Sequence, residues 1–153
     1  MLRLNLPPFP FKIVRNESNV TIFDPLRKKY VALTPEEWVR QHFVQYLINE
    51  RGFPGALIAN EVSIKLHRTS KRCDTVVYDN QLNPLALVEY KAPEVEITQK
   101  VFEQISRYNI VFKVPYLIIS NGLSHYCCQI DYENQRISFL KEIPTYQEII
   151  QNK

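Results

Sequence analysis

The sequence predicts an α/β domain in which helices flank one central mixed β-sheet. Two amphipathic helical segments alternate with runs of strand-forming residues, in the order helix, three strands, helix and further strands. The strand runs are rich in Val, Leu and Ile, and polar turn segments separate them. A chain of 153 residues is long enough to bury a hydrophobic core, so we expect one domain over residues 1–153.

The first segment, residues 1–33, is predicted to be an extended leader that wraps a core made elsewhere in the chain. Three prolines near its start disfavour helix. The stretch VTIFDPLRKKYVAL is typical of short strands interrupted at the Asp-Pro pair. The core is then expected over residues 34–140, followed by a tail over 141–153 with one or two helical turns.

The clearest helix is predicted in the stretch TPEEWVRQHFVQYLINERGFP. Thr34 is the expected N-cap and Pro35 the first helical residue, with two acidic residues in the first turn. Gly52 and the proline two residues later form a stop signal. The apolar residues that recur at spacings of three and four, and that we expect to be buried, are Val39, Phe43, Tyr46 and Leu47.

Three strands of an antiparallel meander are predicted next, within ALIANEVSIKLHR, CDTVVYDN and PLALVEYKA. Polar segments at 69–71 and 80–84 are expected to turn the chain between them. A second helix within EITQKVFEQISRYNIVF should pack its apolar face on the sheet. The run VPYLIIS is typical of a strand covered on both faces, and SHYCCQIDY and RISFLKEI are expected to follow it as further strands.

Charged residues gather at one end of two neighbouring predicted strands. If these strands pair as a hairpin, Asp74 and Glu89 lie side by side, and Lys91 leaves the same face as Glu89 because the two are two residues apart. Converging carboxylates repel each other unless a cation lies between them, and Mg²⁺ is a usual partner for such oxygen ligands. This arrangement predicts metal-assisted hydrolysis of a phosphodiester, in which Lys91 assists the attacking water or stabilises developing negative charge.

These motifs resemble the PD-(D/E)XK nuclease superfamily, and within it the N-terminal nuclease domain of type I restriction enzyme R subunits. The resemblance covers roughly residues 30–125. It is carried by RCD at 72–74, EYK at 89–91, TPEEWVRQ at 34–41 and QISRY at 104–108, which is similar to the superfamily's QxxxY motif. The resemblance implies a restriction-endonuclease-like core and a Mg²⁺-dependent endonuclease acting on DNA, with Mn²⁺ as a substitute for Mg²⁺.

The resemblance also implies a set of metal ligands. Asp74 and Glu89 would bind the metal through their carboxylates, and Tyr90 would add its backbone carbonyl. A glutamate of the first helix often completes the site, and the pattern Glu-x-x-Val-Arg places Glu36 there, with Glu37 as the competitor. Acidic residues in a first turn also complement the helix dipole whatever the function, so this assignment stays open between a ligand and a structural role.

The same resemblance gives Lys91, Gln104 and Tyr108 their expected roles, whereas that of Arg72 is expected from its basic character alone. Lys91 would be the catalytic lysine. Gln104 and Tyr108 lie one helical turn apart and are expected to contact nucleic acid or to orient that lysine. Arg72 and its basic neighbours are expected to contact phosphate, although a solvated loop explains them equally well. One departure from the superfamily pattern is Cys73, which stands where the superfamily's name has proline.

Two functions are compatible with these residues. The first is a metal-dependent deoxyribonuclease in a restriction-modification system or a related defence or repair role. The second is a catalytically silent nuclease fold that binds nucleic acid or a restriction-system partner.

The sequence also sets expectations about partners. It contains no P-loop of the form GxxxxGK[ST], so this chain alone is not expected to couple cleavage to translocation. It is then either a standalone nuclease-like protein or one that depends on a partner, for which the helicase and methyltransferase subunits of a restriction system are the candidates. Cutting both strands with one site per chain would need a homodimer or two encounters. The sequence has neither a signal-peptide pattern nor a long apolar run, so we expect a cytoplasmic protein without a membrane partner.

Overall fold

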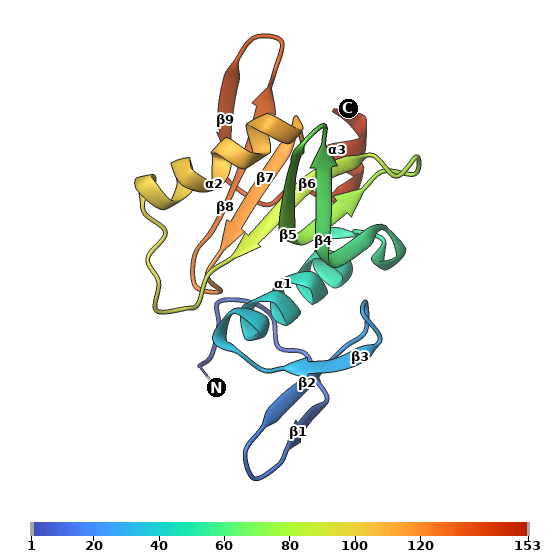
Figure 1. Cartoon of the computed structure of the whole chain (residues 1–153), viewed down its shortest axis with the longest axis vertical. Helices are drawn as coiled ribbons and strands as arrows, with labels where there is room; N and C mark the ends of the chain where they lie inside the picture. Colours follow the sequence, from blue (N-terminus) through green and yellow to red (C-terminus); the bar gives the residue numbers. More distant parts are fainter. Residues whose placement is uncertain (1, 153) are drawn as a thin grey trace.

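A six-stranded mixed sheet forms the centre of the molecule (Figure 1). The structure, a computed structural model, describes residues 2–152, without the side chains of Leu66, Tyr108 and Val111. The strands, in their order across the sheet, are β4 (Ile58–Leu66), β5 (Thr69–Tyr78), β6 (Pro84–Tyr90), β7 (Tyr116–Ser120), β8 (His125–Asp131) and β9 (Arg136–Leu140). The α/β fold with a mixed central sheet is therefore confirmed.

The central strands β6 and β7 run parallel, whereas the other neighbouring pairs of this sheet are antiparallel. Helix α2 (Gln99–Phe112) lies in the connection between them, as a parallel pair requires a long crossover. All five residues of β7 are buried, which confirms the prediction of a strand covered on both faces.

The two long helices cover opposite faces of this sheet. Helix α1 (Pro35–Arg51) packs its apolar residues in one core cluster with Val88 of β6, whereas α2 contributes Phe102 to a second cluster with Leu87. Successive residues of a strand point to opposite faces, so these two clusters lie on the two sides of the sheet. The short helices η1 (Gly55–Leu57) and α3 (Tyr146–Gln151) precede β4 and follow β9.

The ends of α1 are as the sequence predicts. The hydroxyl oxygen of Thr34 accepts a hydrogen bond from the backbone N–H of Glu37 at 3.1 Å, and Gly52 ends the helix with a φ of 71°. Val39, Phe43 and Leu47 are buried, whereas Tyr46 is partly buried at the edge of the same cluster. No helix in the described range is long and apolar enough to cross a membrane.

The leader forms a small sheet of its own beside α1 (Figure 1). Its strands are β1 (Ile13–Arg15), β2 (Val20–Asp24) and β3 (Lys29–Ala32), all antiparallel. The predicted interruption at Asp24 is confirmed, because its carboxylate accepts hydrogen bonds from the backbone N–H groups of Leu26 and Arg27 at 2.7 and 3.1 Å. These hydrogen bonds stabilise the turn that connects β2 to β3.

One predicted turn is wrong. Residues 69–71 belong to β5, and the chain turns earlier, at His67 and Arg68, where His67 has a φ of 55°. The reason is cross-strand pairing: Thr69 pairs with Leu66 and Lys71 with Ile64, which satisfies backbone groups that a polar loop would leave to water. The hairpin is therefore longer than the polar composition of this segment suggests. By contrast, the predicted turn between β5 and β6 is confirmed.

Candidate functional site

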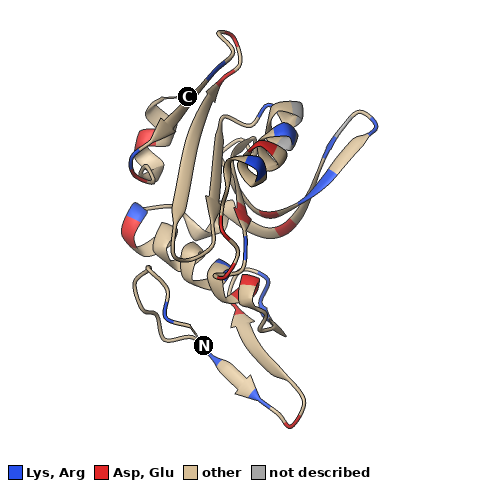
Figure 2. Cartoon of the chain, turned by 90° about the vertical axis from the view of Figure 1, so that its left-hand side faces the viewer, with Lys and Arg blue, Asp and Glu red and all other residues tan. Residues whose placement is uncertain are grey.

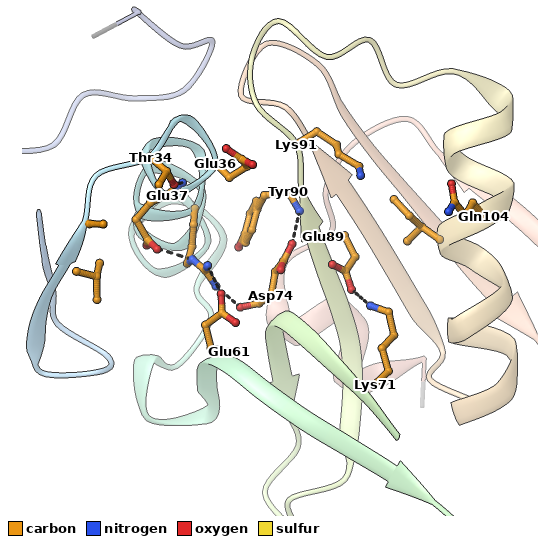
Figure 3. A pocket seen from close by; sticks show the side chains of 14 residues that line it. Thr34, Glu36, Glu37, Glu61, Lys71, Asp74, Glu89, Tyr90, Lys91 and Gln104 are labelled. Atoms are coloured by element: carbon orange, nitrogen blue, oxygen red, sulfur yellow. Dashed lines mark hydrogen bonds and ion pairs between the residues drawn. The ribbon is translucent and has the colours of Figure 1, made fainter. Parts of the chain in front are cut away.

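A cavity of about 630 Å³ lies where the N-terminal sheet, the start of α1, the middle of β4 and β5, the end of β6, and α2 meet (Figure 3). The charged side chains that line it are Glu36, Glu37, Arg40, Glu61, Lys71, Asp74, Glu89 and Lys91. Tyr90 and Gln104 also line it. Of the predicted site residues, Arg72 is not in its lining, and the side chain of Tyr108 lies outside the described part of the chain.

Asp74 and Glu89 lie beside each other, as the hairpin predicts. Thr75 pairs with Val88 in the β5–β6 ladder, so the next position places Asp74 opposite Glu89 (Figure 3). The backbone N–H of Tyr90 donates a hydrogen bond to Oδ2 of Asp74 at 2.9 Å, which fixes that carboxylate. Burial, followed by the negative charge of Asp74, raises the pKa of Glu89 to about 7.

A lysine partly compensates this acidic pair. The ammonium group of Lys71 forms an ion pair with Oε1 of Glu89 inside the cavity (Figure 3). This contact lowers the pKa of Glu89, but burial and the Asp74 charge outweigh it. One positive side chain thus lies against Glu89 in the acidic pair.

Lys91 follows the last residue of β6 and lines the same cavity. Its backbone N–H donates a hydrogen bond to the carbonyl of Ser120 at 2.9 Å, which ties this point of the chain to β7. Figure 3 shows its side chain extending towards the α2 side of the cavity, where Gln104 lies. The structure therefore brings Asp74, Glu89 and Lys91 together with Gln104.

The two first-turn glutamates of α1 differ in their surroundings. Glu37 is buried, and its carboxylate accepts hydrogen bonds from Arg27 at 2.8 and 2.9 Å and from Gln41 at 2.9 Å. Glu36 is exposed at the rim of the cavity. The carboxylate of Glu37 is therefore engaged by Arg27 and Gln41, whereas Glu36 is the exposed one of the two helix acids that line the cavity.

Glu61 is a cavity residue that the sequence does not predict. It lies in β4 with a φ of 57°, which is uncommon for a residue other than glycine and costs free energy. The ladder pairs Asn60 with Thr75 and Val62 with Cys73, but no Cα pair joins Glu61 to Asp74. The only sequence signal was a polar Asn-Glu pair that interrupts an apolar strand pattern.

The side chain of Arg40, from α1, contacts β4 and β5 where their pairing is interrupted. Its Nη1 donates a hydrogen bond to the backbone carbonyl of Asp74, and its Nη2 bonds Glu61, both at 2.5 Å. Its Nε lies 3.1 Å from the carboxylate of Glu37, the first-turn acid three residues earlier. Glu61 in turn accepts a 2.7 Å hydrogen bond from Nε of Arg72, whose side chain is 70% exposed. Arg40 therefore links α1 to the backbone of Asp74.

The donor set available to a metal is an acidic pair rather than a larger cluster. Among the residues that the structure describes, no three His, Cys, Asp or Glu side chains gather closely enough to hold a metal ion. Asp74 and Glu89 supply two carboxylates, and Glu36 lines the same cavity without forming a three-acid group with them.

Comparisons with known proteins agree with this fold. A solved structure, a fragment assigned to the HsdR subunit of a type I restriction enzyme from Vibrio vulnificus YJ016, matches with a TM-score of 0.56 and 20% sequence identity. The match covers 78% of this chain and 25% of that one, so this chain spans about a quarter of the length of that structure. A search of curated proteins found no match.

A family match covers most of the chain. Residues 35–144, which include α1, the central sheet and every charged residue of the cavity, match the family described as type I restriction enzyme R protein N terminus (HSDR_N). The chain therefore belongs to the family of type I restriction enzyme R protein N termini.

Proposed function

We propose that this domain is a Mg²⁺-dependent endonuclease that hydrolyses DNA phosphodiester bonds in the cavity between α1 and α2. The observation that carries the proposal is the pairing of Asp74 with Glu89, with Lys91 in the same cavity. Membership of the type I restriction enzyme R family supports a role in a restriction system.

The residues of the cavity fit a hard divalent cation. Asp74 and Glu89 are neighbouring oxygen donors, and the raised pKa of Glu89 reflects burial and repulsion that a cation would relieve. These two carboxylates and the backbone carbonyl of Tyr90 would hold the ion. Glu36 is the better candidate of the two helix acids, because the carboxylate of Glu37 is engaged by Arg27.

When bound, the cation would polarise a phosphoryl oxygen and neutralise charge on the leaving oxygen. The chain's own residues would do the rest. The Tyr90 N–H and Arg40 hold the side chain and the backbone of Asp74 in place. Lys91 would orient the attacking water and stabilise negative charge as it develops on the phosphate.

A cleavage assay on supercoiled plasmid tests this proposal. We expect nicking in Mg²⁺ or Mn²⁺ that stops with EDTA and is abolished by Asp74→Asn and by Lys91→Met. Lys141→Met, at an exposed position after β9 and outside the cavity lining, is the matched control and should cleave normally. Far-UV circular dichroism would verify that each variant is folded.

Two outcomes would count against the proposal. If the wild type binds DNA but cleaves no form of it with any divalent ion, the silent binding module replaces the nuclease. If Lys91→Met cleaves DNA as well as the wild type does, Lys91 has no role in catalysis.

We further propose that cleavage is coupled to partner subunits of a restriction system, because the chain belongs to the family of type I restriction enzyme R protein N termini. Affinity purification of the tagged protein from its native cells should recover a helicase or a methyltransferase subunit. Recovery of the domain without either would contradict this coupling.

A further inference from the structure

The outer part of the β4–β5 hairpin is a two-stranded ribbon that extends beyond the rest of the sheet. We call residues 62–73 the basic ribbon. Its strands pair with each other from Val62 opposite Cys73 to Leu66 opposite Thr69. The ladder between β5 and β6 starts only at Thr75, so within residues 2–152 no further strand pairs with the β6 side of the ribbon. Figure 2 shows this hairpin projecting from the body of the molecule.

The ribbon carries positive charge without compensating acids of its own. Its sequence, VSIKLHRTSKRC, contains four Lys and Arg residues and no Asp or Glu. Lys65, Arg68 and Arg72 are exposed, and Lys71 is partly buried where it contacts Glu89. Lys71 and Arg72 form ion pairs with Glu89 and Glu61, so the exposed positive charge of the ribbon that these two acids do not offset is that of Lys65 and Arg68.

The two faces of the ribbon have different characters. Val62, Ile64 and Cys73 pack with the core cluster under α2. On the other face the cross-strand pairs are Ser63 with Arg72 and Lys65 with Ser70, and all four residues are exposed. The apolar face thus anchors the ribbon to the domain, and the polar face is left for solvent or a ligand.

The ribbon ends at the cavity. Arg72 contacts Glu61 and Lys71 contacts Glu89, and both of these acids line the cavity. A polyanion held along the exposed face would therefore be led to the position of Asp74, the residue directly after the ribbon. Without such basic residues, the acids of the cavity would repel a phosphate backbone.

From this arrangement we infer that the basic ribbon is an arm that binds the phosphate backbone of duplex DNA and guides it to Asp74 and Glu89. The inference rests on the proposed function and names how its substrate is held. A two-stranded ribbon has the dimensions to enter the major groove of B-DNA, whereas the major groove of duplex RNA is too narrow. The ribbon has no Phe, Tyr or Trp on which single-stranded bases could stack.

Fluorescence anisotropy with a labelled DNA duplex of mixed sequence, in EDTA, tests the inference without any cleavage. The test variant is Lys65→Ala with Arg68→Ala, two exposed residues remote from the acidic pair in the ladder. In roughly 0.1 M salt we expect the affinity to fall about eightfold for each phosphate contact removed. The slope of log affinity against log salt concentration should also become shallower by about 0.9 per contact. The control is Arg136→Ala with Lys141→Ala, exposed residues in and after β9 that remove the same charge.

The control variant should bind DNA nearly as tightly as the wild type, because it loses only long-range electrostatic attraction and keeps the phosphate contacts of the ribbon. Equal losses in both double variants, or wild-type affinity and salt slope in the ribbon variant, would overturn the inference. So would a wild type that fails to bind duplex DNA, or that prefers single strands or duplex RNA of the same length. Failure of the nuclease proposal would look different, because binding without metal would still depend on the ribbon.

Discussion

The guanidinium of Arg40 donates a hydrogen bond to the backbone carbonyl of Asp74 at the point where the β4–β5 ladder lacks a pair. The Arg40 side chain thus bonds the backbone carbonyl of Asp74, where a neighbouring residue of β4 would otherwise pair with it. The same guanidinium contacts Glu37 and Glu61. The position of Asp74 is therefore set by α1 and β4 as well as by its own strand.

We predict that Arg40→Met destabilises the protein by about 3 kcal/mol, because breaking a buried ion pair leaves acids such as Glu37 with less compensation. The side chains of Arg40 and Glu37 are each only 7% exposed. Urea unfolding followed by circular dichroism would measure the change. Arg72→Met is the matched control, since it removes an exposed partner of Glu61 and should cost less than about 1 kcal/mol. Equal costs would contradict a special role for Arg40.

Substitutions of the two first-turn glutamates should have different effects, one on stability and the other on activity. Glu37→Gln is expected to lower the free energy of unfolding by about 2 kcal/mol, because it weakens charge-assisted bonds to Arg27 and Arg40. Glu36→Gln should leave stability within about 0.5 kcal/mol and reduce plasmid nicking. Unfolding and cleavage would be measured on the same preparations. Full activity in Glu36→Gln would remove Glu36 from the metal site.

Lys71 should compete with a divalent cation for Glu89, because its ammonium group is in contact with that carboxylate. We predict that Lys71→Met binds Mg²⁺ or Mn²⁺ several-fold more tightly than the wild type at pH 8, measured by isothermal titration calorimetry. Lys65→Met, on the same hairpin but outside the cavity lining, is the control and should leave the affinity unchanged. Weaker binding in Lys71→Met would mean that Lys71 supports the metal site instead.

Asp24 should make the fold sensitive to acid. Burial alone would raise its pKa, but hydrogen bonds from Arg27, Asn60 and the backbone lower the pKa below the ordinary value. Because the pKa is lower in the folded state, the ionised carboxylate stabilises the fold above its unfolded pKa of about 4, and this contribution is lost as the pH falls further.

Urea unfolding of the wild type and Asp24→Asn at pH 7 and in steps below pH 4 would measure this contribution. The wild type should be the more stable protein at pH 7, and the difference should shrink as the acid titrates. A difference that stays constant over this range would show that Asp24 contributes packing rather than charge.

Features encoded by neighbouring residues were predictable from the sequence. Helix α1 is bounded by Thr34 and Gly52, whose roles depend only on the adjacent turn. The pairing of Asp74 with Glu89 follows from one hairpin and the two-residue period of strands. The turn of the ribbon lies at His67 and not at the predicted residues 69–71, because Thr69 and Ser70 are typical of turns and only their pairing with β4 makes them strand residues.

Features that depend on distant elements were not predictable. Glu61 becomes a cavity residue through a left-handed backbone conformation in the middle of a strand, which its residue type does not signal. The difference between Glu36 and Glu37 depends on Arg27, which comes from the leader and reaches α1 only in the folded chain. Arg40 is an ordinary helix residue in the sequence and gains its role from β4 and β5 together.

A crystal of the protein soaked in Mn²⁺ tests most directly whether the acidic pair holds a divalent cation. We predict an anomalous difference peak between the carboxylates of Asp74 and Glu89, about 2.2 Å from an oxygen of each, with the Lys71 ammonium moved away from Glu89. A peak at another site, or no peak while Lys71 keeps its ion pair with Glu89, would contradict the account.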